Sequence, residues 1–145
     1  MEPSRLRQAL PSLRGSKTKR QRRGRPMSHQ GSCSSEPAGD LAEVLMLDGA
    51  FDRSNAAQVE LALGDAIDTD KPQLVIDLRG VSFLDSTMLR VLIQALGHTV
   101  ARGAQLALIR PNATVWRVFV LTGLSHSFHS FGRLDEALAS FVVSS

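Results

Sequence analysis

The stretch of sequence that decides the fold is LVIDLRGVSFLDSTMLRVLIQAL, from Leu74 to Leu96. It begins with the apolar run Leu74–Ile76, which is typical of a strand covered on both faces of a sheet. The polar run Asp85–Thr87 follows, and side chains of these types cap helix N-termini. Beyond it, apolar residues recur at helical spacing, at Leu89, Leu92, Ile93, Leu96 and Val100. The pattern therefore predicts a strand, a short loop and an amphipathic helix whose apolar stripe faces the core.

Strand and helix signals alternate along the rest of the chain from Leu41 onward. Apolar runs predict further strands over 44–47 and 105–109, and a short one around Phe128 and Phe131. Helical spacing predicts helices over 56–67, 115–122 and 134–141. The alternation predicts a single α/β domain in which helices pack against a mostly parallel sheet.

The first 39 residues have a different composition. Residues 1–37 hold nine basic and two acidic side chains, a net charge of +7, whereas the rest of the chain has a net charge of −4. This segment has no apolar periodicity, and such a composition buries too little surface to offset the entropy of ordering it. We expect a disordered basic tail over 1–39 and a folded domain over 40–145. Met27 is an alternative translation start, in which case residues 1–26 are not made.

Composition also limits the cellular setting. Cys33 is the only cysteine, which leaves no partner for an internal disulfide and fits a reducing cytoplasm. No apolar run approaches the roughly 18 residues needed to span a bilayer, so we expect no membrane insertion. No apolar stretch follows the basic N-terminus to form a signal peptide. A basic tail is one way to bind nucleic acid, but the domain is acidic, and we do not expect nucleic acid as a partner.

Enzyme activity is not expected. A serine hydrolase would need Ser86 beside a histidine and a carboxylate. His98 falls about three turns along the same expected helix, while His126 and His129 follow the next one. The sequence has no Gly-x-Ser-x-Gly elbow and no metal-ligand spacing. We therefore expect no catalytic residue, no metal and no cofactor.

Ser86 lies where the expected strand gives way to a helix. Free backbone N–H groups and the helix dipole favour negative charge at that position, so a phosphate on Ser86 would be tolerated by the free domain. The simpler alternative is that Ser86, or Asp85 beside it, only caps the helix.

Three spaced pieces of the sequence together resemble the STAS domain family. They are LDGAFD at 47–52, IDLRGVSFLDST at 76–87 and LTGL at 121–124. The resemblance extends over about 41–141 and implies a STAS-like fold and the role of an anti-sigma factor antagonist. In that role the unphosphorylated form binds an anti-sigma factor that is itself an ATP-dependent serine kinase, and a sigma factor is released. Phosphorylation breaks the complex, and a serine phosphatase reverses it.

The resemblance also assigns residues to this role. Ser86 matches the phosphorylated serine, and Asp52, Asp85 and Thr87 match positions of the partner-binding surface. Met88 stands where the family usually has glycine, and we place it on the same surface. The alternative function is a non-enzymatic STAS scaffold subunit of a stress-sensing or lipid-transport complex.

Trp116, the only tryptophan, falls off the apolar stripe of the helix expected over 115–122. Two interpretations are open. It is either an exposed anchor for a partner or a cover for the edge of the sheet.

Overall fold

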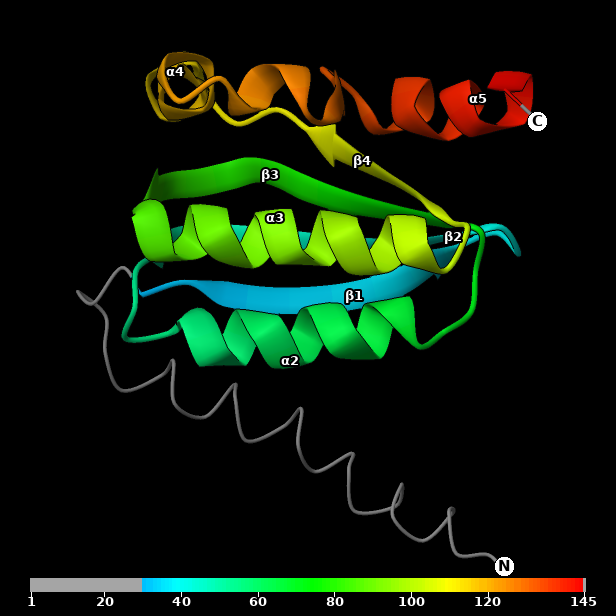
Figure 1. Ribbon diagram of the computed structural model, residues 1–145, viewed down its shortest axis with the longest axis horizontal. Helices are drawn as coiled ribbons and strands as arrows, with labels where there is room; N and C mark the ends of the chain where they lie inside the picture. The colour runs from blue at the N-terminus through cyan, green and yellow to red at the C-terminus, as the bar shows by residue number, and fades with distance from the viewer. Residues whose placement is uncertain (1–29, 145) are drawn as a thin grey trace, which may run out of the picture.

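The computed structural model describes residues 30–144 of the chain (Figure 1). Its elements are β1 (Ser32–Ala38), β2 (Ala42–Phe51), α2 (Ala56–Ile67), β3 (Gln73–Leu84), α3 (Ser86–Ala101), β4 (Gln105–Ile109), α4 (Ala113–Leu121), the 3-10 helix η1 (Leu124–His126), β5 (His129–Phe131) and α5 (Leu134–Ser144). The expected α/β alternation is therefore confirmed from β2 to α5. The basic residues of the expected tail and the alternative start at Met27 lie outside the described residues.

The five strands form one sheet in the order β1-β2-β3-β4-β5. β2, β3, β4 and β5 run parallel, and β1 is antiparallel to β2. Parallel neighbours cannot be joined by a tight turn, so helical crossovers connect them. Because all four parallel strands point the same way, the loops that follow them gather at one edge of the sheet. We call this the carboxyl edge.

Residues 30–38 correct the expected domain boundary. β1 pairs with β2 over its whole length, from Ser32 opposite Asp48 to Ala38 opposite Ala42. Gly31 continues this pairing, since its N–H donates to the carbonyl of Ala50 at 2.8 Å. The segment SCSSEPA is mostly exposed, so backbone hydrogen bonds rather than apolar burial hold it in the sheet. Hydrophobic periodicity does not detect such an edge strand, and the boundary expected at 39/40 was placed too late.

Helices cover the two faces of the sheet unequally. The larger core joins apolar side chains of β2, β3 and β4 to α2, α3 and α4. On the other face a smaller cluster of Val44, Val75, Ala107 and Ile109 packs against Ala137 of α5. α2 and α3 lie side by side and run along the strands (Figure 1). None of the helices between residues 30 and 144 has the length and apolar character that crossing a membrane requires.

The inward face of α3 differs from the predicted stripe. Leu89 and Leu92 are buried as expected, but Ile93 and Val100 are 43% and 60% exposed. Their places in the core are taken by Val91, Ala95 and Thr99, among others. Thr99 is tolerated there because its hydroxyl donates to the carbonyl of Ala95 at 2.7 Å. α3 packs against both α2 and the sheet, and the face that it buries also includes the small residues Ala95 and Thr99.

Gly31→Ala tests whether residues 30–38 belong to the folded domain. A Cβ at Gly31 would overlap the ring of buried Phe51, so this substitution is expected to lower the free energy of unfolding by about 1–3 kcal/mol. The matched control is Gly97→Ala in α3, where the added methyl meets open space. Alanine there is expected to raise the free energy of unfolding by about 0.5–1 kcal/mol. Urea-induced unfolding measures both, and a neutral Gly31→Ala would contradict the packing of this segment on Phe51.

Candidate functional site

The carboxyl ends of β2 and β3 bring two loops together. Phe51 and Leu84, the last residues of these strands, are register partners. Asp52 and Asp85 follow them directly, so the two carboxylates leave neighbouring strand ends. The predicted site residues Asp52 and Ser86 are therefore brought to the same edge of the sheet by strand register, although 33 positions separate them in the sequence.

Asp85 is the N-cap of α3. Its backbone is extended, and its Oδ1 accepts a hydrogen bond from the backbone N–H of Met88 at 3.1 Å. A carboxylate at this position satisfies one of the unpaired amides of the first turn and complements the helix dipole. Of the two capping alternatives, Asp85 is the one observed.

Ser86 therefore does not cap the helix. It is the first residue of α3, and its side chain is exposed. Within the described part of the chain its hydroxyl forms no side-chain hydrogen bond, because the cap bond is supplied by Asp85. An exposed, uncommitted hydroxyl on a rigid helix terminus is accessible to another protein's active site.

Met88 does not lie on this surface. Its side chain is 0% exposed and belongs to the core, whereas Thr87 beside it is half-buried. The side chain of Met88 is therefore not exposed on the surface where we placed this residue. The reason is helical phase, since the third residue of α3 points inward while the first points outward.

The Asp52 loop is held in place by short hydrogen bonds. The Asp52 carboxylate accepts from the backbone N–H and the hydroxyl of Ser54 at 2.8 Å and 2.5 Å. The side-chain hydrogen bond from Ser54, followed by the one from its backbone, lowers the pKa of Asp52 below its ordinary value. Asp52 is exposed, so the edge beside Ser86 carries a stable negative charge.

Asn55 is a site residue whose role the sequence did not indicate. It occupies the N-cap position of α2, but its side chain makes no capping bond. Instead its Oδ1 accepts from the backbone N–H of Asp52 at 2.9 Å, and its Nδ2 donates to the carbonyl of Ala50 at 3.1 Å. Asn55 is buried and fixes the loop that presents Asp52.

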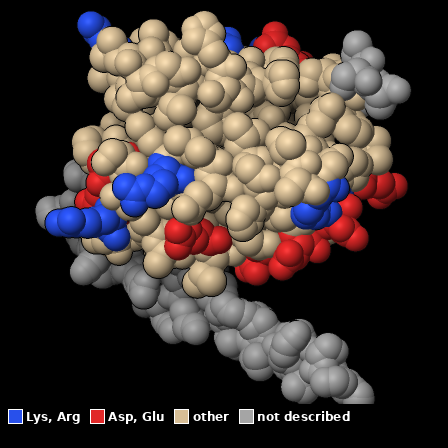
Figure 2. Space-filling model, in the orientation of Figure 1, with Lys and Arg blue, Asp and Glu red and all other residues tan. Residues whose placement is uncertain are grey.

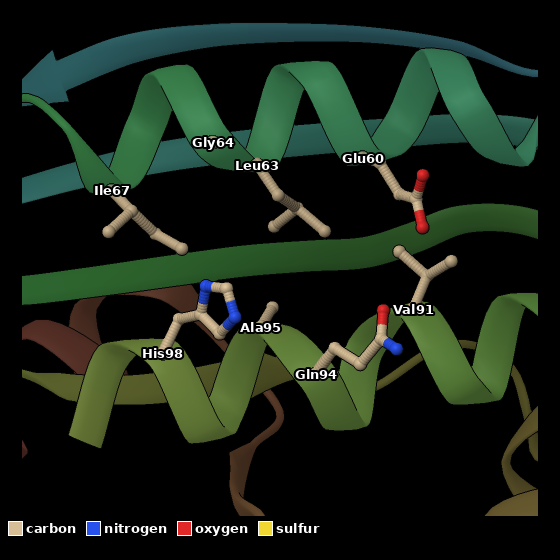
Figure 3. Close-up of a pocket in the computed structure, with 8 residues that line it drawn as sticks. All are labelled: Glu60, Leu63, Gly64, Ile67, Val91, Gln94, Ala95 and His98. Carbon is tan, nitrogen blue, oxygen red and sulfur yellow. The ribbon is translucent and has the colours of Figure 1, made fainter. Parts of the chain in front are cut away.

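A groove of about 220 Å³ lies between α2 and α3. Its floor is largely apolar and its polar side chains are Glu60, Gln94 and His98 (Figure 3). None of the predicted site residues lines it. Among residues 30–144, no three His, Cys, Asp or Glu side chains gather as metal ligands would.

The face that carries α2 and α3 is mixed in charge. Figure 2 shows basic and acidic side chains near the end where α3 begins, and acidic side chains along the border formed by α2. α2 itself contains Glu60 and Asp65 and no basic residue. Both basic and acidic side chains therefore lie near the carboxyl edge.

Trp116 packs onto the domain. Its ring stacks on Phe119 with centroids 4.8 Å apart, and Phe119 in turn meets Phe128 edge to face. Trp116 is half-buried against the larger core. This contact favours the covering role over the exposed anchor.

Comparison with known proteins identifies the family. A family model described as the STAS domain matches residues 39–137, so the chain belongs to the STAS domain family. The anti-sigma-F factor antagonist RsfB of Mycobacterium tuberculosis is 32% identical over 95 residues, which cover 66% of this chain and 77% of that protein. The anticipated family is thus confirmed.

Solved structures agree in fold. An anti-sigma factor antagonist from Mycobacterium paratuberculosis superposes with a TM-score of 0.70 at 26% identity, over 78% of this chain and 95% of that one. SpoIIAA in its unphosphorylated form gives a TM-score of 0.65 at 21% identity, over 76% of this chain and 96% of that one. The second likeness concerns the fold alone.

Two substitutions test whether Asp85, and not Ser86, stabilises the domain by capping α3. Asp85→Ala is expected to lower the free energy of unfolding by about 1 kcal/mol, because the cap of α3 is lost. Ser86→Ala is expected to change it by less than about 0.5 kcal/mol, because the side chain is exposed. Urea-induced unfolding measures both. A loss with Ser86→Ala equal to that with Asp85→Ala would mean that Ser86 has a structural role.

Proposed function

We propose that this chain is an anti-sigma factor antagonist whose binding is controlled by phosphorylation of Ser86. Two findings support the proposal: the chain belongs to the STAS domain family, and its relative RsfB is named as an antagonist of this kind. The observation that carries it is the exposed Ser86 hydroxyl beside Asp85, which already caps the helix. The chain binds and releases a partner, in the cytoplasm, and catalyses no reaction itself.

The chemistry of the switch belongs to the partners. An anti-sigma factor with serine kinase activity transfers the γ-phosphoryl group of ATP to Oγ of Ser86. The hydroxyl proton passes to a base of the kinase, and ADP leaves. A serine phosphatase restores the hydroxyl by hydrolysis and releases inorganic phosphate. This chain contributes the acceptor oxygen and the docking surface formed by Asp52, Asp85 and Thr87.

The free domain tolerates a phosphate on Ser86. The group adds about −1.5 to −2 charges, and the amino end of α3 favours negative charge. Exposure of Ser86 lets water solvate the phosphate oxygens. Phosphorylation is therefore expected to leave the fold intact.

A docked partner does not tolerate it. An uncompensated charge buried in an interface costs roughly 3–5 kcal/mol, which lowers affinity by about 10²- to 10⁴-fold. Asp52 is already anionic nearby, so the phosphate increases the negative charge of this edge. The phosphate changes the charge of the edge and its shape at once.

Binding measurements test this function. Each anti-sigma factor with a serine kinase domain from the same organism is purified and titrated with the chain by calorimetry. One of them is expected to bind the wild type, and Ser86→Asp is expected to weaken that complex at least about tenfold, because one added charge supplies part of the phosphate's effect. The matched control is Ser127→Asp, which places the same charge on an exposed serine between η1 and β5, away from the carboxyl edge.

Phosphosite mapping completes the test. With ATP, the bound kinase is expected to modify the wild type at Ser86 and to leave Ser86→Ala unmodified. If Ser86→Asp binds as tightly as the wild type, or the phosphate maps to another residue, the switch is refuted. A scaffold subunit of a larger complex would give that result.

A further inference from the structure

Arg90 lies one helical turn beyond Ser86. The two residues are four apart in α3, and both are exposed. Residues at this spacing are neighbours on a helix surface, with their Cβ atoms about 5–6 Å apart. Helical side chains also lean toward the N-terminus of their helix. This spacing therefore puts the long side chain of Arg90 on the same face of α3 as Ser86, within reach of it.

No anion on α3 faces Arg90. Its other neighbours three and four residues away are Thr87, Ile93 and Gln94, which are all neutral, and α3 contains no Asp or Glu. The ion pairs among the described residues join Lys71 to Glu43, Arg79 to Asp77, Arg102 to Asp70 and Arg133 to Asp135. In the described part of the chain Arg90 is thus a cation outside any ion pair.

The other charged groups around Ser86 have partners. The Asp85 carboxylate accepts from the N–H of Met88, and that of Asp52 accepts from Ser54. Arg53 sits beside Asp52, and its charge contributes to the lowered pKa of that carboxyl group. Arg53 thus has a carboxylate beside it, whereas none of the ion pairs among the described residues involves Arg90.

We propose that Arg90 is the intramolecular counter-ion of phosphorylated Ser86. The proposal rests on the proposed function, since it requires the phosphate. The planar guanidinium donates two hydrogen bonds to phosphate oxygens, a geometry that suits arginine better than lysine. The phosphate is then held against its own helix. Phosphorylation consequently changes the docking edge twice, because it adds an anion and withdraws the exposed cation of Arg90 from a partner.

The test uses the full chain with phosphoserine installed at position 86 during translation, so that no kinase is needed. ³¹P NMR titration gives the second pKa of the phosphate. In the wild type this pKa is expected to be lower than in Arg90→Gln by about 0.3 unit or more, because a nearby cation favours the dianion. Arg90→Lys is expected to retain part of the difference. The matched control, Arg117→Gln, neutralises an exposed arginine on α4 and is expected to leave the pKa unchanged.

Equal pKa values in the wild type and Arg90→Gln would overturn the proposal. A second variant, in which the basic residues between Lys17 and Arg25 are neutralised, provides another check. If the phosphate pKa rises in that variant but keeps its wild-type value in Arg90→Gln, the proposal is also overturned. That result would assign the counter-ion to the basic segment. Neither outcome depends on a partner protein. Failure of the switch itself would appear in the Ser86→Asp binding measurement instead.

Discussion

The parallel pairing of β2 with β3 is the constraint on which the rest of the molecule depends. It begins at Ala42 and Gln73 and ends at Phe51 and Leu84, with irregular register near Asp48. At that irregularity the side chain of Asp48 lies over Gly80, where any Cβ would crowd its carboxylate. Because the strands end level with each other, the chain turns into α2 and α3 at neighbouring points. This register brings the carboxylates of the two loops and the Ser86 hydroxyl to the same edge of the sheet.

Each loop residue at this edge has a separate task. Asp85 binds the helix amide, Asn55 binds the backbone of its loop, and Met88 fills the core. These three hold the loops, and none of them needs the Ser86 hydroxyl. A serine whose side chain does not stabilise the fold can gain a charged group without unfolding the domain. This is the physical requirement for a reversible modification.

The sequence predicted the elements whose apolar residues are clustered and buried. Leu74–Ile76 and the helix after Asp85 were recognised because burial in a covered sheet demands such runs. β1 was missed because its residues are polar and its stability comes from backbone pairing. The buried face of α3 was predicted from helical spacing, which included Ile93 and left out Ala95, whereas α3 packs against both α2 and the sheet and buries Ala95.

The candidate site was predicted in part. Strand and helix signals placed Ser86 at a helix start, and family resemblance connected it with Asp52. The predicted stripe of α3 began at Leu89, and the pattern did not show that Met88, one residue earlier, is buried as well. Neither Asn55 nor Arg90 belongs to a sequence motif. The role of Asn55 follows from the backbone geometry of its loop, and that of Arg90 follows from the lack of a neighbouring anion.

The inward anchoring of Met88 has a consequence for association. A glycine at this position would leave the first turn of α3 more conformational freedom. Here a large side chain seated in the core fixes that turn before any partner arrives. Little backbone entropy then remains to be lost when a complex forms, so contacts made at this end of the helix contribute more fully to affinity. Such a surface favours a partner that already matches its shape over one that must remodel it.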